Sequence, residues 1–160
     1  MNKDMTVPCE DGLINLRVGA IIMKNGQILM VGNDIHPEYL YSIGGRIKFG
    51  ETSEEAIVRE VFEETGVKLE IERLGFIHEN YFYGDIASNF RKLIYEVSYF
   101  YYMKVPDDFE PVCMTMTEDD HEEFLRWIDV DDPIMYYPEF FRSELLHPEA
   151  GVKHFVTDER

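Results

Sequence analysis

The chain has 160 residues, and its 15 lysines and arginines against 32 aspartates and glutamates leave a formal net charge of −17. Hydrophobic residues make up 45% of the chain, a composition that excludes a disordered protein and suits one domain spanning residues 1–160. A chain this acidic repels the phosphate backbone and anionic lipids, so we expect neither nucleic acid nor a membrane as a partner. The negative charge does not exclude binding of small phosphorylated ligands, because a divalent metal ion reverses the local charge.

The sequence has neither a basic start followed by an apolar run nor an apolar stretch of the roughly 18 residues that span a bilayer. We therefore expect a cytoplasmic protein.

The first half of the chain predicts a hairpin followed by a single helix. The first dozen residues are polar and are expected to form a loose lead-in. Asn25-Gly26 readily takes positive φ and predicts a turn between two strands. Thr52 is the expected N-cap with Glu55 as its capping-box partner, and Gly66 is the expected stop. The expected elements are strands at 13–23, 28–31 and 40–43 and a helix at 52–65.

The second half of the chain predicts more strands and a closing helix. The aromatic-rich run at 90–105 alternates as a long strand does, and Pro138 suits the first turn of a helix. Strands around one central helix, with another helix at the end, predict an α/β fold with a mixed sheet. The expected elements are strands at 67–82, 90–105 and 124–130, an acidic loop at 106–120, a helix at 138–147, and a strand or ordered tail at 151–157.

Three carboxylates share one side of the expected helix. Glu60, Glu63 and Glu64 are spaced i, i+3 and i+4, which brings side chains within roughly 5–6 Å of each other. Like charges this close destabilise a helix, and Arg59 is the counter-charge that the helix itself offers. A hard divalent cation takes such oxygen ligands and keeps waters for a phosphate, so the pattern predicts Mg²⁺ or Mn²⁺ as cofactor. The neighbouring side of the helix is expected to face the core with Ile57, Val58, Val61, Phe62 and Thr65.

The segment before the helix suits the same purpose. Gly44 and Gly45 are expected in a loop, where the backbone can approach a ligand and a carbonyl can add an oxygen ligand. Glu51 lies just ahead of the cap, near the positive end of the helix dipole.

Residues 45–67 resemble the signature of the Nudix hydrolases. That signature reads Gly, five residues, Glu, seven residues, then Arg-Glu-aliphatic-any-Glu-Glu-any-Gly-aliphatic. All nine specified positions match, and a chance match has a probability on the order of 10⁻⁹ per start site. One neighbouring position departs from many family members, since Ile43 stands where they have proline. The matching residues are Gly45, Glu51, Arg59, Glu60, Val61, Glu63, Glu64, Gly66 and Val67.

The resemblance implies a fold, an activity and roles for the residues of the signature. The implied fold is an α/β/α sandwich with a mixed sheet between helices. The implied activity is metal-dependent hydrolysis of a diphosphate linkage in a nucleoside diphosphate derivative, such as a nucleotide sugar, an ADP-ribose-like or an NTP-like compound. Either Glu60 or a later carboxylate would handle the attacking water, and a homodimer is a family-level expectation. The implied roles are metal binding by Glu60, Glu63, Glu64 and the Gly44 carbonyl, positioning of these glutamates by Arg59, and support of Arg59 by Glu51.

Weaker candidates lie outside the signature. An additional carboxylate is expected among Glu118, Asp120 and Glu122, for which the alternative is a solvated acidic loop. Relatives use the region of Glu79 near the substrate, and Tyr41 and Phe82 could stack on a base, whereas an ordinary place in the strand packing or on the surface is the simpler explanation for all three. Gly45 is the fourth substrate-binding candidate.

Two other functions are open on the sequence alone. A Nudix-fold module that senses a nucleotide or another ligand without turnover is one, although such modules often lose signature glutamates and this chain keeps all of them. An acidic calcium-binding domain is the other, but the chain has no EF-hand loop of the DxDxDG type.

Overall fold

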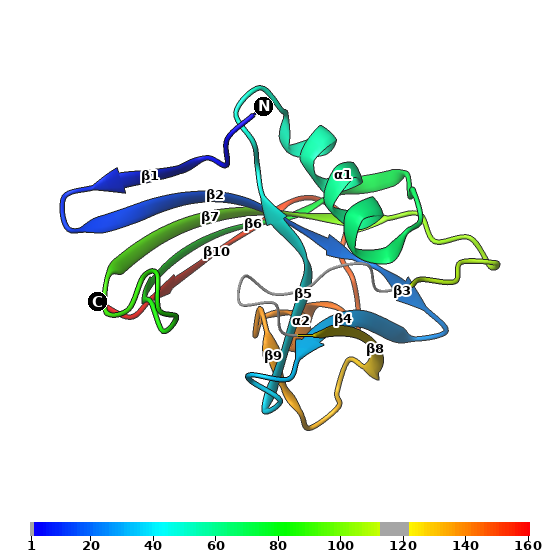
Figure 1. Ribbon diagram of the computed structural model, residues 1–160. Coiled ribbons are helices and arrows are strands. Elements are labelled where there is room, and N and C mark those ends of the chain that lie inside the picture. The colour runs from blue at the N-terminus through cyan, green and yellow to red at the C-terminus, as the bar shows by residue number, and fades with distance from the viewer. Residues whose placement is uncertain (1, 113–121) are drawn as a thin grey trace.

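A computed structural model describes residues 2–112 and 122–160, and its elements form one mixed sheet with a helix on each face (Figure 1). The helices are α1 (Ser53–Thr65) and the short α2 (Phe141–Glu144). The strands are β1 (Thr6–Cys9), β2 (Gly12–Ile21), β3 (Met23–Lys24), β4 (Gln27–Asn33), β5 (Tyr39–Arg46), β6 (Ile71–Tyr83), β7 (Leu93–Met103), β8 (Glu123–Asp129), β9 (Met135–Tyr137) and β10 (Lys153–Asp158).

The strands run in the order β10-β6-β7-β2-β5-β4-β3, while β1 pairs with β2, β8 with β4 and β9 with β5. The pairs β2–β7, β6–β10 and β5–β9 are parallel, and the other pairs are antiparallel. The expected α/β class with a mixed sheet is therefore confirmed.

The two faces of the sheet build two separate cores, because successive residues of a strand point to opposite sides. Val18 and Ala20 of β2 pack with Ile57 and Val61 of α1 on one face. Ile21 and Phe100 pack with Phe141 of α2 on the other face. Figure 1 shows α1 above the sheet and α2 below it. No helix within residues 2–112 and 122–160 is long and apolar enough to cross a membrane.

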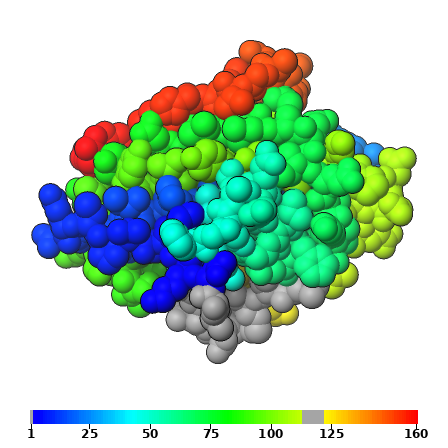
Figure 2. Space-filling view, turned by 90° about the horizontal axis from the view of Figure 1, so that it is seen from above, coloured from blue at the N-terminus to red at the C-terminus, as the bar shows by residue number. Residues whose placement is uncertain are grey.

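The expectation of a loose N-terminal segment is wrong. Residues 6–9 form β1 and pair with residues 12–15 of β2. The Met5 amide donates to the Ile47 carbonyl at 2.8 Å, and the Phe49 amide donates to the Lys3 carbonyl at 2.7 Å. Figure 2 shows this blue N-terminal segment beside the cyan loop that leads into α1. Backbone pairing orders this strand, and its four residues are too few to show an apolar alternation that would predict it.

Three further boundaries differ from the expectations. Strand β5 continues through Gly44 and Gly45 to Arg46, so the two glycines lie in a strand rather than in a loop. Strand β9 was not expected, since its three residues lie between turns and lack a run of alternating apolar residues. Helix α2 covers four residues rather than 138–147, and its N-terminus has no side-chain cap. Pro148 further disfavours helical backbone at the residue before it.

Candidate active site

Helix α1 carries the signature glutamates, and both of its ends lie where the sequence predicts. The Thr52 hydroxyl accepts from the Glu55 amide at 3.1 Å, and the Glu55 carboxylate accepts from the Thr52 amide at 2.9 Å. Gly66 closes the helix with φ 74°, in the left-handed region that glycine adopts without strain. The buried side chains of Ile57 and Val61 hold the helix on the sheet, which sets the direction of the glutamates.

Glu64 lies against the backbone of β5. It is 9% exposed, and its Oε2 accepts a hydrogen bond of 3.3 Å from the Gly44 amide. Burial raises the pKa of Glu64 well above its ordinary value, and the charges of Glu60 and Glu123 raise it further. A cation placed here would relieve that penalty, because it would offset the charge of a buried carboxylate.

Glu60 rests on the second glycine of the pair. A Cβ atom at Gly45 would lie 2.3 Å from Glu60 Oε1, so a larger residue there would displace this carboxylate. Burial raises the pKa of Glu60, and its hydrogen bond and attraction to Arg59 oppose that rise. The glycine pair therefore lets two helix carboxylates approach the strand backbone. The glycines do this as part of strand β5 and not as part of a loop, as the sequence had led us to expect.

Arg59 connects three other expected site residues, Glu51, Glu60 and Glu63. Its Nε and Nη2 donate to the two Glu51 carboxylate oxygens at 2.5 and 3.0 Å. Its Nη1 donates to Glu60 Oε1 at 2.8 Å and to Glu63 Oε2 at 3.2 Å. The pKa of Glu51 is lowered, chiefly by its hydrogen bond to Arg59. Glu63 is the most open of these carboxylates, with 45% of its side chain exposed.

Glu123, the first residue of β8, is a site carboxylate that sequence reasoning missed. Its Oε2 accepts from the Tyr41 hydroxyl at 3.4 Å, and its charge raises the pKa of Glu64. Asn33 Nδ2 donates to the same hydroxyl at 3.3 Å, and burial is the largest cause that raises the pKa of Tyr41 to about 12. The alternation of side chains along β8 could have revealed Glu123 from the sequence. Glu123 shares a strand face with Leu125 and Trp127, which pack on the α1 core.

Of the three carboxylates predicted from the acidic loop, the described residues include Glu122 alone. Glu118 and Asp120 lie outside the described residues. Glu122 is exposed, and its carbonyl accepts a hydrogen bond of 3.4 Å from the Asp34 amide. Because successive side chains of a strand point to opposite faces, Glu123 rather than Glu122 turns toward Glu64.

With this geometry established, comparison with known proteins identifies the family. The model of the NUDIX domain matches residues 14–147, which is most of the chain. The chain belongs to the NUDIX family. The resemblance found in residues 45–67 is thereby confirmed, and with it the α/β sandwich fold.

Solved NUDIX structures share the fold over nearly the whole chain. A MutT NUDIX hydrolase from Burkholderia pseudomallei is 26% identical, with a TM-score of 0.62 over 85% of this chain and 98% of that one. A MutT protein from Bacillus halodurans is 17% identical, with a TM-score of 0.63 over 91% and 93% of the two chains. An ADP-ribose pyrophosphatase from Streptococcus suis is 19% identical, with a TM-score of 0.56 over 88% and 98%.

A MutT-like protein from Streptomyces ambofaciens is 30% identical over 73 residues, which are 46% of this NUDIX chain. The match spans about half the length of that relative (47%).

The carboxylates of α1, together with Glu123 of β8, fit a hard divalent cation in chemistry. Glu60, Glu64 and Glu123 offer carboxylate oxygens, the ligand type that Mg²⁺ prefers. As the side chains stand, no three acidic, histidine or cysteine groups in the described ranges are gathered into a cation site. Glu60 turns instead to Arg59, and Glu64 turns to the Gly44 amide. The Gly44 carbonyl, proposed from the resemblance as a ligand, belongs to the same stretch of β5.

The weaker substrate candidates are spread over the sheet. Tyr41 and Gly45 contact the carboxylate cluster through Glu123 and Glu60. Glu79 and Phe82 lie on β6, which β7 and β2 separate from β5. The Glu79 carboxylate accepts from the Tyr95 hydroxyl at 2.5 Å and lies 2.6 Å from His154 Nε2. The structure therefore brings two of these four residues to the glutamates.

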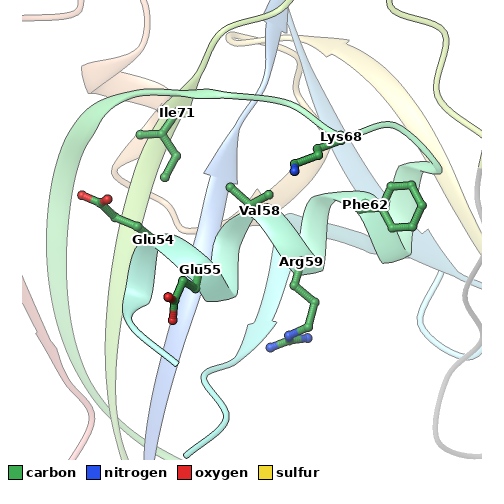
Figure 3. A pocket seen from close by; sticks show the side chains of 7 residues that line it. All are labelled: Glu54, Glu55, Val58, Arg59, Phe62, Lys68 and Ile71. Atoms are coloured by element: carbon green, nitrogen blue, oxygen red, sulfur yellow. The ribbon is translucent and has the colours of Figure 1, made fainter. Parts of the chain in front are cut away.

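An open apolar groove of about 570 Å³ lies on the outer side of α1 (Figure 3). Phe62 was expected in the core, but it is 50% exposed and lines this groove. The helix packs on the sheet through a narrower stripe of Ala56, Ile57 and Val61, which leaves Phe62 outside. The lining residues are Glu54, Glu55, Val58, Arg59, Phe62, Lys68 and Ile71.

Proposed function

We propose that this protein is a Mg²⁺- or Mn²⁺-dependent hydrolase that cleaves a diphosphate linkage in a nucleoside diphosphate derivative. The observation that carries the proposal is the placement of Glu60 and Glu64 against Gly44 and Gly45. The partly desolvated carboxylates of Glu60 and Glu64 lie beside the more exposed Glu63, and their combined negative charge favours binding of a divalent metal ion.

Each residue of the cluster has a part in this function. Glu60, Glu64 and the Gly44 carbonyl would hold the metal ion, and Glu63 would be a further ligand. Arg59 orients Glu60 and Glu63, and Glu51 fixes the guanidinium of Arg59. A divalent ion bound here supplies charge neutralisation for phosphate oxygens and a site for the attacking water. These residues act as one electrostatic unit, so we expect the effects of single substitutions not to add.

The attacking water needs a carboxylate that orients it or accepts its proton. Within the part of the chain that the structure describes, Glu60 and Glu123 are the candidates, since both lie close enough to Glu64 to raise its pKa by their charge. Glu123 would be a later carboxylate of the kind that the resemblance implies. Tyr41 donates a hydrogen bond to Glu123 and so limits the directions in which that carboxylate can point.

A substrate panel tests the proposal directly. The protein is incubated with Mg²⁺ and nucleoside diphosphate sugars, dinucleotides or nucleoside triphosphates, and phosphate is measured after phosphatase is added. We expect metal-dependent release from at least one class of compound. No release from any class would instead favour a NUDIX module that binds a ligand without turnover.

Glu64→Gln separates catalysis from folding. The amide keeps the shape of the side chain, and we expect turnover to fall roughly 100-fold or more, the scale of losing one electrostatic stabiliser. Because burial disfavours the charged carboxylate, the variant should unfold in EDTA at the same temperature as the natural protein or higher. Mn²⁺ should raise the unfolding temperature of the natural protein alone. Full activity with unchanged metal stabilisation would refute the ligand role of Glu64.

A further inference from the structure

Asn33 ends strand β4 beside the carboxylate cluster. It is the last residue of the strand and only 7% exposed, so its side-chain amide is a buried polar group. In the antiparallel register it lies directly opposite Glu123 of β8. Val31 and Leu29, two and four residues earlier on the same face of β4, belong to the α1 core. A polar amide therefore ends an apolar strand face at the point where that face meets Glu123.

Hydrogen bonds to the backbone fix the direction of the Asn33 amide. Its Oδ1 accepts from the Ile35 amide at 3.0 Å and from the His36 amide at 2.8 Å. A backbone N–H can only donate, so the side-chain oxygen must face these two groups and Nδ2 must face away from them. Nδ2 lies 3.3 Å from the Tyr41 hydroxyl oxygen, which therefore accepts from it.

The Tyr41 hydroxyl passes this direction on to Glu123. A phenol carries one proton, and an N–H group that points at its oxygen leaves that proton to be donated elsewhere. An ionised carboxylate can only accept, and Glu123 Oε2 lies 3.4 Å from the hydroxyl. The donors of this Asn33–Tyr41–Glu123 relay thus all point toward the carboxylate, whose charge in turn acts on Glu64.

The two ends of the Asn33 amide have different tasks. The oxygen stabilises the turn that follows β4, where the His36 ring stacks on Tyr39 with centroids 5.4 Å apart. Aspartate makes this kind of turn as readily as asparagine does. The turn alone therefore does not require an amide nitrogen at this position, whereas the hydrogen bond to Tyr41 does.

We propose that Asn33 is a positioning residue that holds the Glu123 carboxylate, through the Tyr41 hydroxyl, in the orientation in which Glu123 takes part in catalysis. This inference rests on the proposed hydrolase function, in which Glu123 is a candidate to orient the attacking water or accept its proton. Glu123 is the first residue of β8, so its own strand begins with it. A displacement of about 1 Å in a reacting group can cost roughly 100-fold in rate, which makes such positioning effective.

Carbon-13 NMR tests the relay without turnover. Protein labelled at glutamate Cδ is studied in EDTA, and the Glu123 signal is the one that Glu123→Gln removes. Asn33→Ser is neutral and too short to reach the Tyr41 hydroxyl, so we expect it to shift this signal in the same direction as Tyr41→Phe does. In a protein that already carries Tyr41→Phe, Asn33→Ser should cause no further shift, because Asn33 acts through Tyr41.

Steady-state kinetics separate the relay from the turn. Asn33→Asp keeps an oxygen for the two backbone amides but offers Tyr41 a second acceptor in place of a donor. We expect kcat to fall about tenfold in both Asn33→Asp and Asn33→Ser, with KM changed less than about twofold. Exchange of the His36 amide should stay slow in Asn33→Asp, because the turn is kept. Asn25→Asp adds the same charge at the exposed turn before β4 and should change neither kcat nor the Glu123 signal.

The outcomes are distinct. A Glu123 signal that does not move in Asn33→Ser would overturn the positioning role, and so would a shift of the same size with and without Tyr41→Phe. Natural turnover in Asn33→Asp would show that Asn33 serves the turn alone. Coupled signals without Mg²⁺-dependent hydrolysis would support the relay and refute the hydrolase, whereas hydrolysis at full rate in both Asn33 variants would do the reverse.

Discussion

Glu51 binds Arg59 through two parallel hydrogen bonds, from Nε to Oε1 at 2.5 Å and from Nη2 to Oε2 at 3.0 Å. Glu51 precedes α1, and its Oε2 also accepts from the Lys48 amide at 2.9 Å. Nη1 of the same guanidinium donates to Glu60 and Glu63. A residue outside the helix therefore sets the direction of two glutamates on the helix.

Removing the charge of Glu51 should weaken this arrangement. Glu51→Gln keeps the size of the side chain but loses the charge-assisted pair, so we expect turnover to fall about tenfold or more, as for groups that orient metal ligands. The free energy of unfolding should fall by about 1–2 kcal/mol, because the Arg59 pair is mostly buried. Steady-state kinetics and urea unfolding measure the two effects. The exposed Glu72→Gln is the control and should change neither; unchanged kinetics in Glu51→Gln would contradict the positioning role.

Alanine at the two neighbouring glycines should give opposite results. At Gly45 the new Cβ meets the Glu60 carboxylate at 2.3 Å, a side-chain end that can move, so activity should fall about tenfold or more with little loss of stability. At Gly44 the new Cβ meets the Val18 carbonyl oxygen at 2.1 Å, a backbone atom that cannot easily move. Gly44→Ala should therefore lose roughly 1–3 kcal/mol of stability. Thermal unfolding and initial rates distinguish the two variants, and a stable, fully active Gly45→Ala would disprove the contact.

The strand face that a carboxylate occupies decides its role, and adjacent residues test this. Glu123→Gln should lower turnover roughly 10–100-fold, because Glu123 shares the buried site with Tyr41 and Glu64. Glu122→Gln, one residue away and exposed, should leave turnover unchanged. Tyr41→Phe should have an intermediate effect, since it removes the hydrogen bond and keeps the ring. Equal losses in Glu122→Gln and Glu123→Gln would rule out this assignment.

His78 should make stability depend on pH. Burial, with a smaller contribution from His154, lowers the pKa of His78 from 6.5 to about 4. The unfolded chain therefore takes up this proton first as the pH falls, so the contribution is complete above about pH 6.5 and is lost toward pH 4. Between about pH 8 and pH 5 the loss amounts to roughly 2 kcal/mol.

Urea unfolding at these two pH values measures the effect. His78→Gln is the control, because an amide can keep the hydrogen bond to the Thr157 hydroxyl, 2.9 Å from His78 Nε2 in the natural protein. The difference between the two proteins removes the contribution of all other groups. An equal loss of stability in both proteins would show that His78 does not titrate as described.

Local patterns identified the helix and the spacing of its glutamates, but not what surrounds them. The N-cap at Thr52, the stop at Gly66 and the spacing of the glutamates follow from neighbouring residues, so they were predictable. Phe62 was assigned to the core by its period, yet it lies outside, because the width of the buried stripe depends on what the helix packs against. Strand β1 was misjudged because its backbone pairing with β2, rather than an apolar pattern, orders it, and α2 is shorter than predicted because its N-terminus has no side-chain cap.

By itself, the sequence determined the family, the α/β class and the positions of the glutamates, because these depend on residue types at short spacings along one helix. Only the tertiary structure decided that Glu123 joins Glu64, that Gly45 receives the Glu60 carboxylate, and that Arg17 faces Arg46. Each of those relationships joins different elements through strand register and face. A shift of register by one residue would turn every such side chain to the other side of the sheet, so short-range patterns cannot specify them.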